Sequence, residues 1–145
     1  MLTPRQQGDF GELSAAYWLA SRGATLALPF GTNPHWDLIA ELDGRMLRVQ
    51  VKTSRSYQLG RWVIHVSTSG GNQSSNRVVK LLDPSTFDYL FVLVGSGRRW
   101  FIPAERIEGV RALRLGGPKY AEFDVEHGDP ILGCVVQEAP STIAS

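Results

Sequence analysis

The strongest constraint on the fold is a hairpin signal in the first third of the chain, the pair Asp43-Gly44. It separates WDLIAEL from RMLRVQVKTS, two runs in which apolar and polar residues largely alternate. An Asp-Gly pair between two such runs favours a two-residue hairpin turn, because that turn needs positive φ at both central positions. The sequence therefore predicts two antiparallel strands in which Leu42 faces Arg45.

That register decides which side chains share a face. It sets Asp37 across from Gln50, and strand alternation returns Lys52 to the same face. The apolar residues point the other way, toward a core: Leu38, Ala40, Leu42, Leu47, Val49 and Val51. A slip by one residue would expose this whole set, so the core side fixes the register. We thus expect a cluster of an aspartate, a glutamine and a lysine on an otherwise apolar hairpin.

Two interpretations fit the polar cluster. Mg²⁺ takes oxygen ligands, usually one or two carboxylates with water and substrate phosphate, and a neighbouring lysine can stabilise charge on that phosphate. Glu12 would supply a second carboxylate if the first helix packs near the open end of the hairpin. The plain alternative is a cross-strand ion pair between Asp37 and Lys52, with Gln50 on a half-solvated strand.

The first segment carries the signals of an N-terminal helix. Thr3 is a candidate N-cap, Pro4 suits the first helical position, and Gln6 completes a capping box. Gly23 is a natural stop. The apolar residues with helical spacing are Phe10, Leu13, Tyr17 and Ala20. Gly8 and Gly11 each cost about 1 kcal/mol inside a helix relative to alanine, so we expect close approach to the backbone there.

Further strands are expected from the alternating or apolar runs RWVIHVST, FDYLFVLVG, RRWFIP, VRALRL and AEFDV. FDYLFVLVG is apolar enough for a central strand that is covered on both faces. The fold class is therefore α/β, with one N-terminal helix on a mixed sheet of about five or six strands. With 145 residues, the chain fits a single domain over 1–137, and residues 138–145 are expected to form a disordered tail.

Charge is unevenly distributed, although the net charge is only +1. Between Asp43 and Asp83 there is no acidic residue, while seven basic residues fall there: Arg45, Arg48, Lys52, Arg55, Arg61, Arg77 and Lys80. Such a segment can attract phosphate, or it can simply be a solvated surface. The single cysteine, Cys134, excludes an internal disulfide and fits a reducing compartment. We expect a cytoplasmic protein with no membrane association.

Glu12 on the first helix, Asp37 on a strand and Gln50-Val51-Lys52 on the next strand resemble the PD-(D/E)XK nuclease superfamily. The stretch from GDFGELSAAYW to RVQVKTSR, with FDYLFVLVG and WFIPAERI downstream, is similar to the subgroup that contains the cyanobacterial group I intron homing endonuclease. The resemblance implies a restriction-endonuclease-like core and a metal held by Glu12, Asp37 and the Val51 carbonyl. It implies Mg²⁺, with Mn²⁺ able to substitute, and a catalytic role for Lys52. Gln50 stands where the superfamily usually has an acid, and glutamine in that place is also seen in the closer subgroup.

The function implied by the resemblance is a metal-dependent DNA endonuclease that is homing-endonuclease-like or junction-resolving. The alternative, which Gln50 keeps open, is a non-catalytic DNA-binding or assembly module with a weakened metal site. The expected DNA contacts are Thr53, Ser54, Arg55, Arg61, Arg77 and Lys80. One site per chain needs a second copy to cut both strands, so we expect a homodimer or homotetramer.

Overall fold

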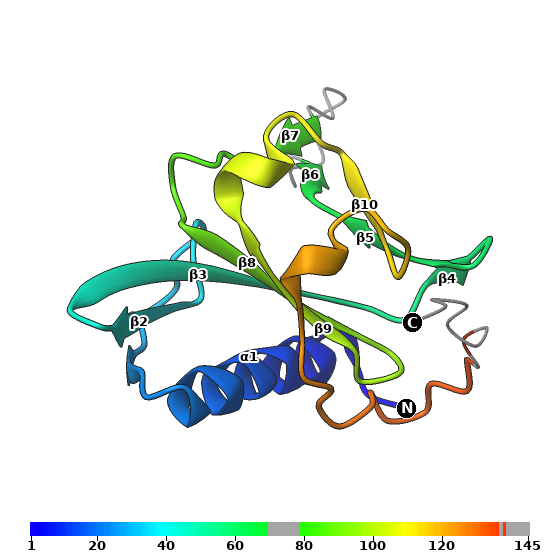
Figure 1. The fold of residues 1–145 in the computed structure, drawn as a ribbon, viewed down its shortest axis with the longest axis horizontal. Helices are drawn as coiled ribbons and strands as arrows, with labels where there is room; N and C mark the ends of the chain where they lie inside the picture. The colour runs from blue at the N-terminus through cyan, green and yellow to red at the C-terminus, as the bar shows by residue number, and fades with distance from the viewer. Residues whose placement is uncertain (70–78, 137, 139–145) are drawn as a thin grey trace.

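The computed structural model describes residues 1–69, 79–136 and 138. In chain order the elements are α1 (Pro4–Ser21), β1 (Thr25–Ala27), β2 (Leu38–Leu42), β3 (Arg45–Ser54), β4 (Tyr57–Gln58), β5 (Arg61–His65), β6 (Ser67–Ser69), β7 (Val79–Leu81), β8 (Tyr89–Val94), β9 (Arg99–Pro103), the 3₁₀ turn η1 (Ala104–Ile107), β10 (Ala112–Leu115), η2 (Ala121–Phe123) and β11 (Asp124–Val125). Figure 1 shows their arrangement.

Six strands form the main sheet, in the order β1-β2-β3-β8-β9-β11. β3 and β8 run parallel at its centre, and the other neighbours are antiparallel. The expectation of a central strand at FDYLFVLVG is confirmed by β8, which is buried from Leu90 to Val94. Helix α1 covers one face of this sheet (Figure 1). The expected α/β class, with one helix on a mixed sheet, is confirmed.

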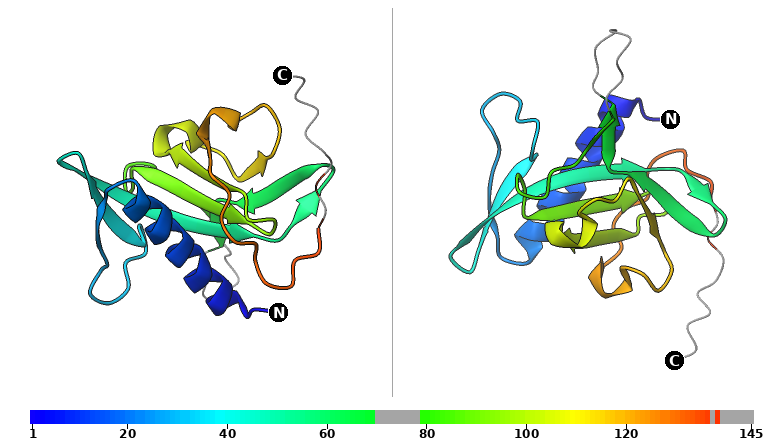
Figure 2. Two further views of the ribbon diagram at one scale, coloured as in Figure 1. Left: turned by 60° about the horizontal axis from the view of Figure 1, so that its bottom comes forward. Right: turned by 90° about the horizontal axis from the view of Figure 1, so that it is seen from above.

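A second, smaller sheet covers the opposite face of the main sheet, with the strand order β10-β5-β4. Figure 2 shows it from two further directions, on the side away from α1. β5 and β10 come from RWVIHVST and VRALRL, which the sequence correctly indicates as strands. Their alternation does not reveal that they leave the main sheet, because a strand of either sheet buries one face.

The main sheet therefore lies between two apolar cores. On the α1 side, Ala15, Trp18 and Leu19 pack against β2, β3 and Phe91. On the other side, Trp62 and Ile64 of β5 pack against β8 and β9, together with Leu113 and Leu115 of β10. Both faces of β8 are thus covered, which explains why β8 is apolar without interruption.

Helix α1 begins and ends as the sequence predicts. The Thr3 side chain accepts a hydrogen bond from the Gln6 backbone N–H, the Gln6 side chain caps Thr3 in return, and Gly23 has a φ of +92°. The apolar face is different from the expected one. Leu13 and Tyr17 are 68% and 76% exposed, whereas Gly11, Ala15, Trp18 and Leu19 are buried. The helix turns its small residues to the sheet because they allow the closer approach.

The described part of the connection from β3 to β8 contains four short strands. Parallel neighbours need a long crossover, which is usually helical. Here the chain passes through β4, β5, β6 and β7 before it returns at Tyr89. The small sheet therefore originates largely inside this crossover, and β10 joins it from later in the chain.

The C-terminal segment is held at Glu138, where we expected a disordered tail to begin. Its carboxylate accepts hydrogen bonds from the Ser96 hydroxyl at 2.6 Å, the Arg98 guanidinium at 2.9 Å and the indole N–H of Trp62. The domain thus includes residue 138, and residues 139–145 lie outside the described part of the chain. No helix among the described residues is long and apolar enough to cross a membrane.

Candidate active site

The hairpin has the predicted register over β2, with Leu42 facing Arg45 and Leu38 facing Val49. At Asp37 the pairing changes. The Asp37 N–H bonds to the Val49 carbonyl at 2.8 Å, so Asp37 and Leu38 both oppose Val49, as in a β-bulge. Asp37 does not face Gln50 as a regular ladder would require. Its carboxylate Oδ2 instead accepts the Val51 N–H at 2.7 Å, in the place of a backbone acceptor.

This bulge places the Asp37 carboxylate at an edge of β3 that β2 no longer covers. The Val49 carbonyl and the Val51 N–H both point to that edge, since both bond to Asp37. The N–H and C=O of one residue point to the same side of a strand, so the Val51 carbonyl also faces this edge. The Val51 carbonyl therefore faces the same strand edge as the Val51 N–H that Asp37 accepts.

Glu12 reaches Asp37 from the helix. Burial and the repulsion of the Asp37 carboxylate together raise the pKa of Glu12 from its ordinary 4.5 to about 7, and a hydrogen bond between the two groups adds to the rise. Two carboxylates that share a site in this way favour the state in which one of them is protonated. The structure therefore brings together the two acids that the sequence singles out.

Gly11 is the reason that Glu12 can approach the strand. A Cβ at Gly11 would lie 2.4 Å from the Thr53 Cγ2 and 3.3 Å from the Val51 Cγ1. Gln7 makes a second contact between α1 and β3, because its amide donates a hydrogen bond to the Thr53 hydroxyl at 2.8 Å. The sequence signalled Gly11 through its cost in a helix, but it gave no sign of Gln7. Gly8 has open space around it, so the expected close approach does not occur there.

Gln50 is 8% exposed, and its Oε1 has no hydrogen-bond partner in the described part of the chain. A buried acceptor without a partner costs about 1–3 kcal/mol. Gln50 lies one residue before Val51 on β3, and a ligand bound at its amide oxygen would remove this cost. Lys52 lies two residues on and is half-buried. The expected alternative of an Asp37–Lys52 ion pair does not occur among the ion pairs of the described residues.

These donors suit a hard divalent cation. Within the described ranges, no three His, Cys, Asp or Glu side chains converge on a common point. The available oxygens are instead two carboxylates, the unpaired Gln50 amide oxygen and the Val51 carbonyl. Oxygen ligands of this kind are those that Mg²⁺ and Mn²⁺ bind, and a cation between Glu12 and Asp37 would relieve their repulsion. The residues present therefore fit the metal that the resemblance implies.

The residues expected to contact DNA differ in burial and in their hydrogen-bond partners. Ser54 is 9% exposed, and its hydroxyl donates to the Val63 carbonyl at 2.6 Å and accepts from the Ser56 N–H. Ser54 thus joins β3 to β5, which argues against a DNA contact through its side chain. Thr53 faces α1 through Gln7, and Arg55 and Arg61 are half-exposed.

Two more of the expected DNA contacts follow β5 in the chain. Lys80 lies in β7, where it pairs with Thr68. Arg77 lies outside the described residues, as do its neighbours 70–76 and 78.

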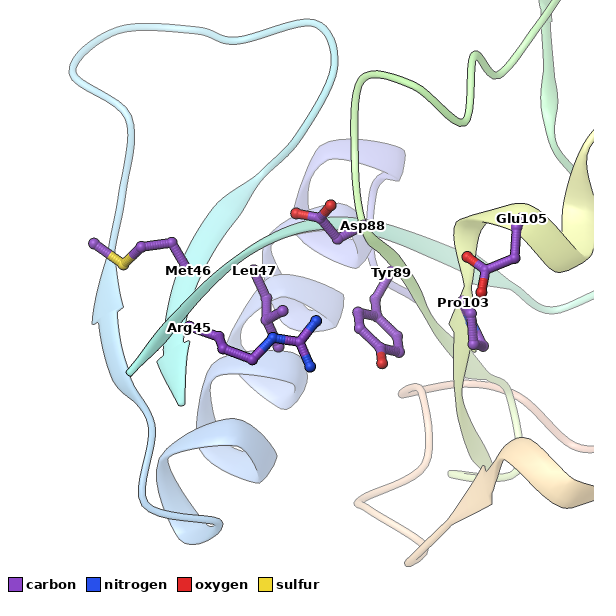
Figure 3. A pocket seen from close by; sticks show the side chains of 7 residues that line it. All are labelled: Arg45, Met46, Leu47, Asp88, Tyr89, Pro103 and Glu105. Atoms are coloured by element: carbon purple, nitrogen blue, oxygen red, sulfur yellow. The ribbon is translucent and has the colours of Figure 1, made fainter. Parts of the chain in front are cut away.

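A hollow elsewhere on the surface does not belong to this site. It is lined by Arg45, Met46, Leu47, Asp88, Tyr89, Pro103 and Glu105 (Figure 3). Its volume of about 190 Å³ is smaller than the ~300–1,000 Å³ of typical small-molecule sites. Its lining includes the start of β3 but neither Glu12, Asp37 nor Val51, so the candidate site lies outside this hollow.

Comparisons with known proteins agree with this geometry. The family model described as PD-(D/E)XK endonuclease matches residues 2–121. Among solved structures, the bacterial homing endonuclease I-Ssp6803I has a similar fold, with a TM-score of 0.76 and 21% sequence identity over 85% of this chain and 89% of that one. A search of curated proteins finds no significant match. The resemblance that the sequence indicated is confirmed, and the chain belongs to the PD-(D/E)XK endonuclease family.

Proposed function

We propose that this protein is a Mg²⁺-dependent endonuclease that hydrolyses phosphodiester bonds in DNA. The observation that carries the proposal is the meeting of Glu12 and Asp37 at the open edge of β3, where burial and the Asp37 carboxylate raise the pKa of Glu12. A pair of acids arranged in this way is unfavourable without a cation, and perturbed acids of this kind gather at functional sites. Membership of an endonuclease family supports the same reading.

Each residue then has a role. Glu12, Asp37 and the Val51 carbonyl would hold the cation, and Gln50 would offer its amide oxygen as a neutral ligand. When bound, a divalent cation stabilises charge on the phosphate and lowers the pKa of a bound water. Lys52 would orient the attacking water or stabilise the charge that develops on the phosphate. The neutral Gln50 lowers the total ligand charge, which favours a single cation over two.

The test is a cleavage assay on supercoiled, linear and four-way-junction DNA with Mg²⁺ or Mn²⁺. We expect cleavage by the wild-type protein, and we expect Lys52→Ala to lose at least about 100-fold in rate, as for other charge-stabilising groups. Arg45→Ala is the matched control, since it removes a cation from the other end of the same strand. Thermal unfolding of each variant shows whether it is folded.

The outcome also separates the endonuclease from the non-catalytic module. DNA binding without a nick, in either metal and on all three substrates, would reject the endonuclease and support the module. Cleavage that survives Lys52→Ala would reject the assigned site. A substrate preference among the three forms would decide between a homing-endonuclease-like and a junction-resolving activity.

The proposal includes assembly and location. One site per chain cuts one strand, so we propose a homodimer or homotetramer in the cytoplasm. Sedimentation equilibrium should therefore give a mass above the 16.0 kDa of one chain. A monomer at concentrations that cleave both strands would contradict this part of the proposal.

A further inference from the structure

Two segments without acidic residues meet in the small sheet. One is the stretch between Asp43 and Asp83, which contains β4 and β5. The other runs from Gly109 to Ala121 and contains β10, with Arg111, Arg114 and Lys119. The two are far apart in the sequence, and β10 pairs with β5 in antiparallel register from Ala112↔His65 to Leu115↔Trp62. The pairing of β10 with β5 therefore brings these two segments together in the small sheet, on the side of the main sheet away from α1 (Figures 1 and 2).

The register decides which side chains face outward. Leu113 and Leu115 share the core side with Ile64 and Trp62. Arg114 pairs with Val63 and is exposed, so it stands on the outer face. Arg61 and His65 lie two residues on either side of Val63 and therefore point to that face as well. Arg111 and Lys119, at the two ends of this segment, are also exposed.

Four arginines outside the small sheet have acidic partners. Arg22 pairs with Glu126, Arg48 with Asp88, Arg98 with Asp124 and Glu138, and Arg106 with Glu122. The four cations of the small sheet, Arg61, Arg111, Arg114 and Lys119, have no carboxylate within 4.0 Å in the described part of the chain. Their charge is thus available to a partner outside the chain.

Arg61 is also held in place. A Cβ at Gly117 would lie 2.4 Å from the Arg61 Nε, so the side chain rests against the glycine backbone. Its guanidinium donates to the Gly60 carbonyl at 2.9 Å. A guanidinium that is already positioned loses less conformational entropy when it binds an anion.

We propose that the outer face of the β4–β5–β10 sheet binds the phosphate backbone of duplex DNA, on the part of the substrate that flanks the cleaved bond. The inference rests on the proposed function, since it names the surface that holds the DNA. Arg61 was expected from the sequence, whereas Arg114 and Lys119 were not, because they follow the basic segment by many residues. Phosphate contacts from such residues fix the position of a protein on DNA without reading its sequence.

The test measures affinity for duplex DNA by fluorescence anisotropy, without divalent cations so that nothing is cut. The test variant combines Arg61→Gln with Arg114→Gln. One control combines Arg61→Lys with Arg114→Lys, which keeps both charges. The other control is Arg45→Gln, which removes a charge at the start of β3 in the main sheet. We expect the glutamine pair to weaken binding about tenfold for each arginine lost and to reduce the slope of log K against log salt by about 0.9 per contact. The lysine pair and Arg45→Gln should keep the wild-type slope.

Each result has a separate meaning. A glutamine pair that is folded, as thermal unfolding shows, but binds with the affinity and slope of Arg45→Gln overturns the inference, even if the wild type cleaves DNA. A wild type that binds in the predicted way but cuts nothing with Mg²⁺ or Mn²⁺ overturns the endonuclease and leaves this surface standing. A wild type that binds no duplex overturns the inference too.

Discussion

At the scale of single residues, the candidate site depends on the contacts of the Asp37 carboxylate. Its Oδ2 accepts the Val51 N–H, which fixes the carboxylate at the strand edge. Burial and this same carboxylate together raise the pKa of Glu12. The Asp37 side chain thus takes the place of a backbone acceptor at the end of the hairpin. It also adds negative charge beside Glu12, and this charge favours the binding of a cation. The buried amide oxygen of Gln50 has no hydrogen-bond partner among the described residues, and it would offer a neutral ligand without a third negative charge.

The neutral residue at position 50 can be tested by Gln50→Glu. A third carboxylate in this buried position would raise metal affinity, and it would lower the stability of the metal-free protein by about 1–3 kcal/mol. Titration calorimetry with Mn²⁺ and urea unfolding with and without Mn²⁺ would measure both effects. Gln58→Glu, on exposed β4, is the matched control and should change neither. Lower metal affinity in Gln50→Glu would contradict the assignment of position 50 as a ligand.

The pKa of Glu12 predicts how the metal-free protein responds to pH. The folded protein keeps the Glu12 proton up to about pH 7, whereas the unfolded chain releases it near the ordinary value of 4.5. The stabilisation from this proton is complete below pH 4.5 and is lost as the pH rises to about 7. We expect urea unfolding to show a loss on the order of 1 kcal/mol over that range, because solvent screens part of the shift.

Glu12→Gln should remove that pH dependence, since an amide does not titrate. Metal affinity of the wild type should rise over the same range, because the cation competes with the proton. Equal pH profiles for wild type and variant would show that Glu12 and Asp37 do not interact.

At the scale of elements, the site depends on how closely α1 lies against β3. Gly11 is the contact point, and the Thr53 methyl is its nearest neighbour. Glu12 follows directly, so a shift of the helix would move this carboxylate away from Asp37. The geometry of the site is therefore a property of the helix–strand contact as well as of the ligands.

A matched pair of glycine substitutions tests this contact. Gly8→Ala should stabilise the protein by up to about 1 kcal/mol, because nothing lies within 4 Å of the new methyl group. Gly11→Ala should destabilise it by about 1–3 kcal/mol and lower metal affinity, because its methyl group would overlap Thr53. Chemical unfolding and Mn²⁺ titration measure the two effects.

A second substitution identifies the cause. Thr53→Ser removes the overlapping methyl and keeps the hydroxyl that accepts from Gln7. In the Gly11→Ala background it should restore most of the lost stability. A double-mutant cycle without coupling between positions 11 and 53 would show that the loss at Gly11 has another origin.

At the scale of the whole molecule, the chain closes on itself through Glu138. Burial acts to raise the pKa of this carboxyl group, but hydrogen bonds from Ser96, Trp62 and Arg98 outweigh it and lower the pKa. These partners belong to β5 and to the turn between β8 and β9, so the C-terminal segment joins the small sheet to the main one.

Glu138→Ala should therefore destabilise the protein by about 1–3 kcal/mol at neutral pH, since it leaves Trp62 and Arg98 with fewer partners. The lowered pKa means that this stabilisation is present above the ordinary value and is lost as the pH falls, so the effect should shrink in acid. Glu122→Ala is the control, because its pair with Arg106 is exposed and worth at most about 1 kcal/mol. Similar losses in the two variants at pH 7 would contradict the role of Glu138.

Some of this architecture follows from local sequence and some does not. The Asp43-Gly44 turn and the Thr3 cap are local, and the structure has both as predicted. The prediction of the buried face of α1 was wrong. Leu13 and Tyr17 have helical spacing but are exposed, whereas Gly11 and Ala15 pack against the main sheet. Helical spacing alone does not reveal which of two stripes meets a sheet.

The candidate site shows the same division. Asp37, Gln50 and Lys52 come from the hairpin pattern, but the bulge at Asp37 depends on a side chain replacing a backbone acceptor. The contact of Gln7 with Thr53 and the pairing of β10 with β5 join residues that are distant in the chain. No periodic pattern encodes such contacts, so they become visible only in three dimensions.

The strand-built crossover between β3 and β8 has a consequence for how such proteins can diversify. The residues that would hold the cation lie on α1, the hairpin and β3, before the crossover starts. In the endonuclease that we propose, insertions, deletions or new charges in the crossover would remodel the surface of the small sheet without touching the residues that would hold the cation. A single domain of this size could in this way acquire new target preferences piece by piece, with its proposed metal ligands inherited unchanged.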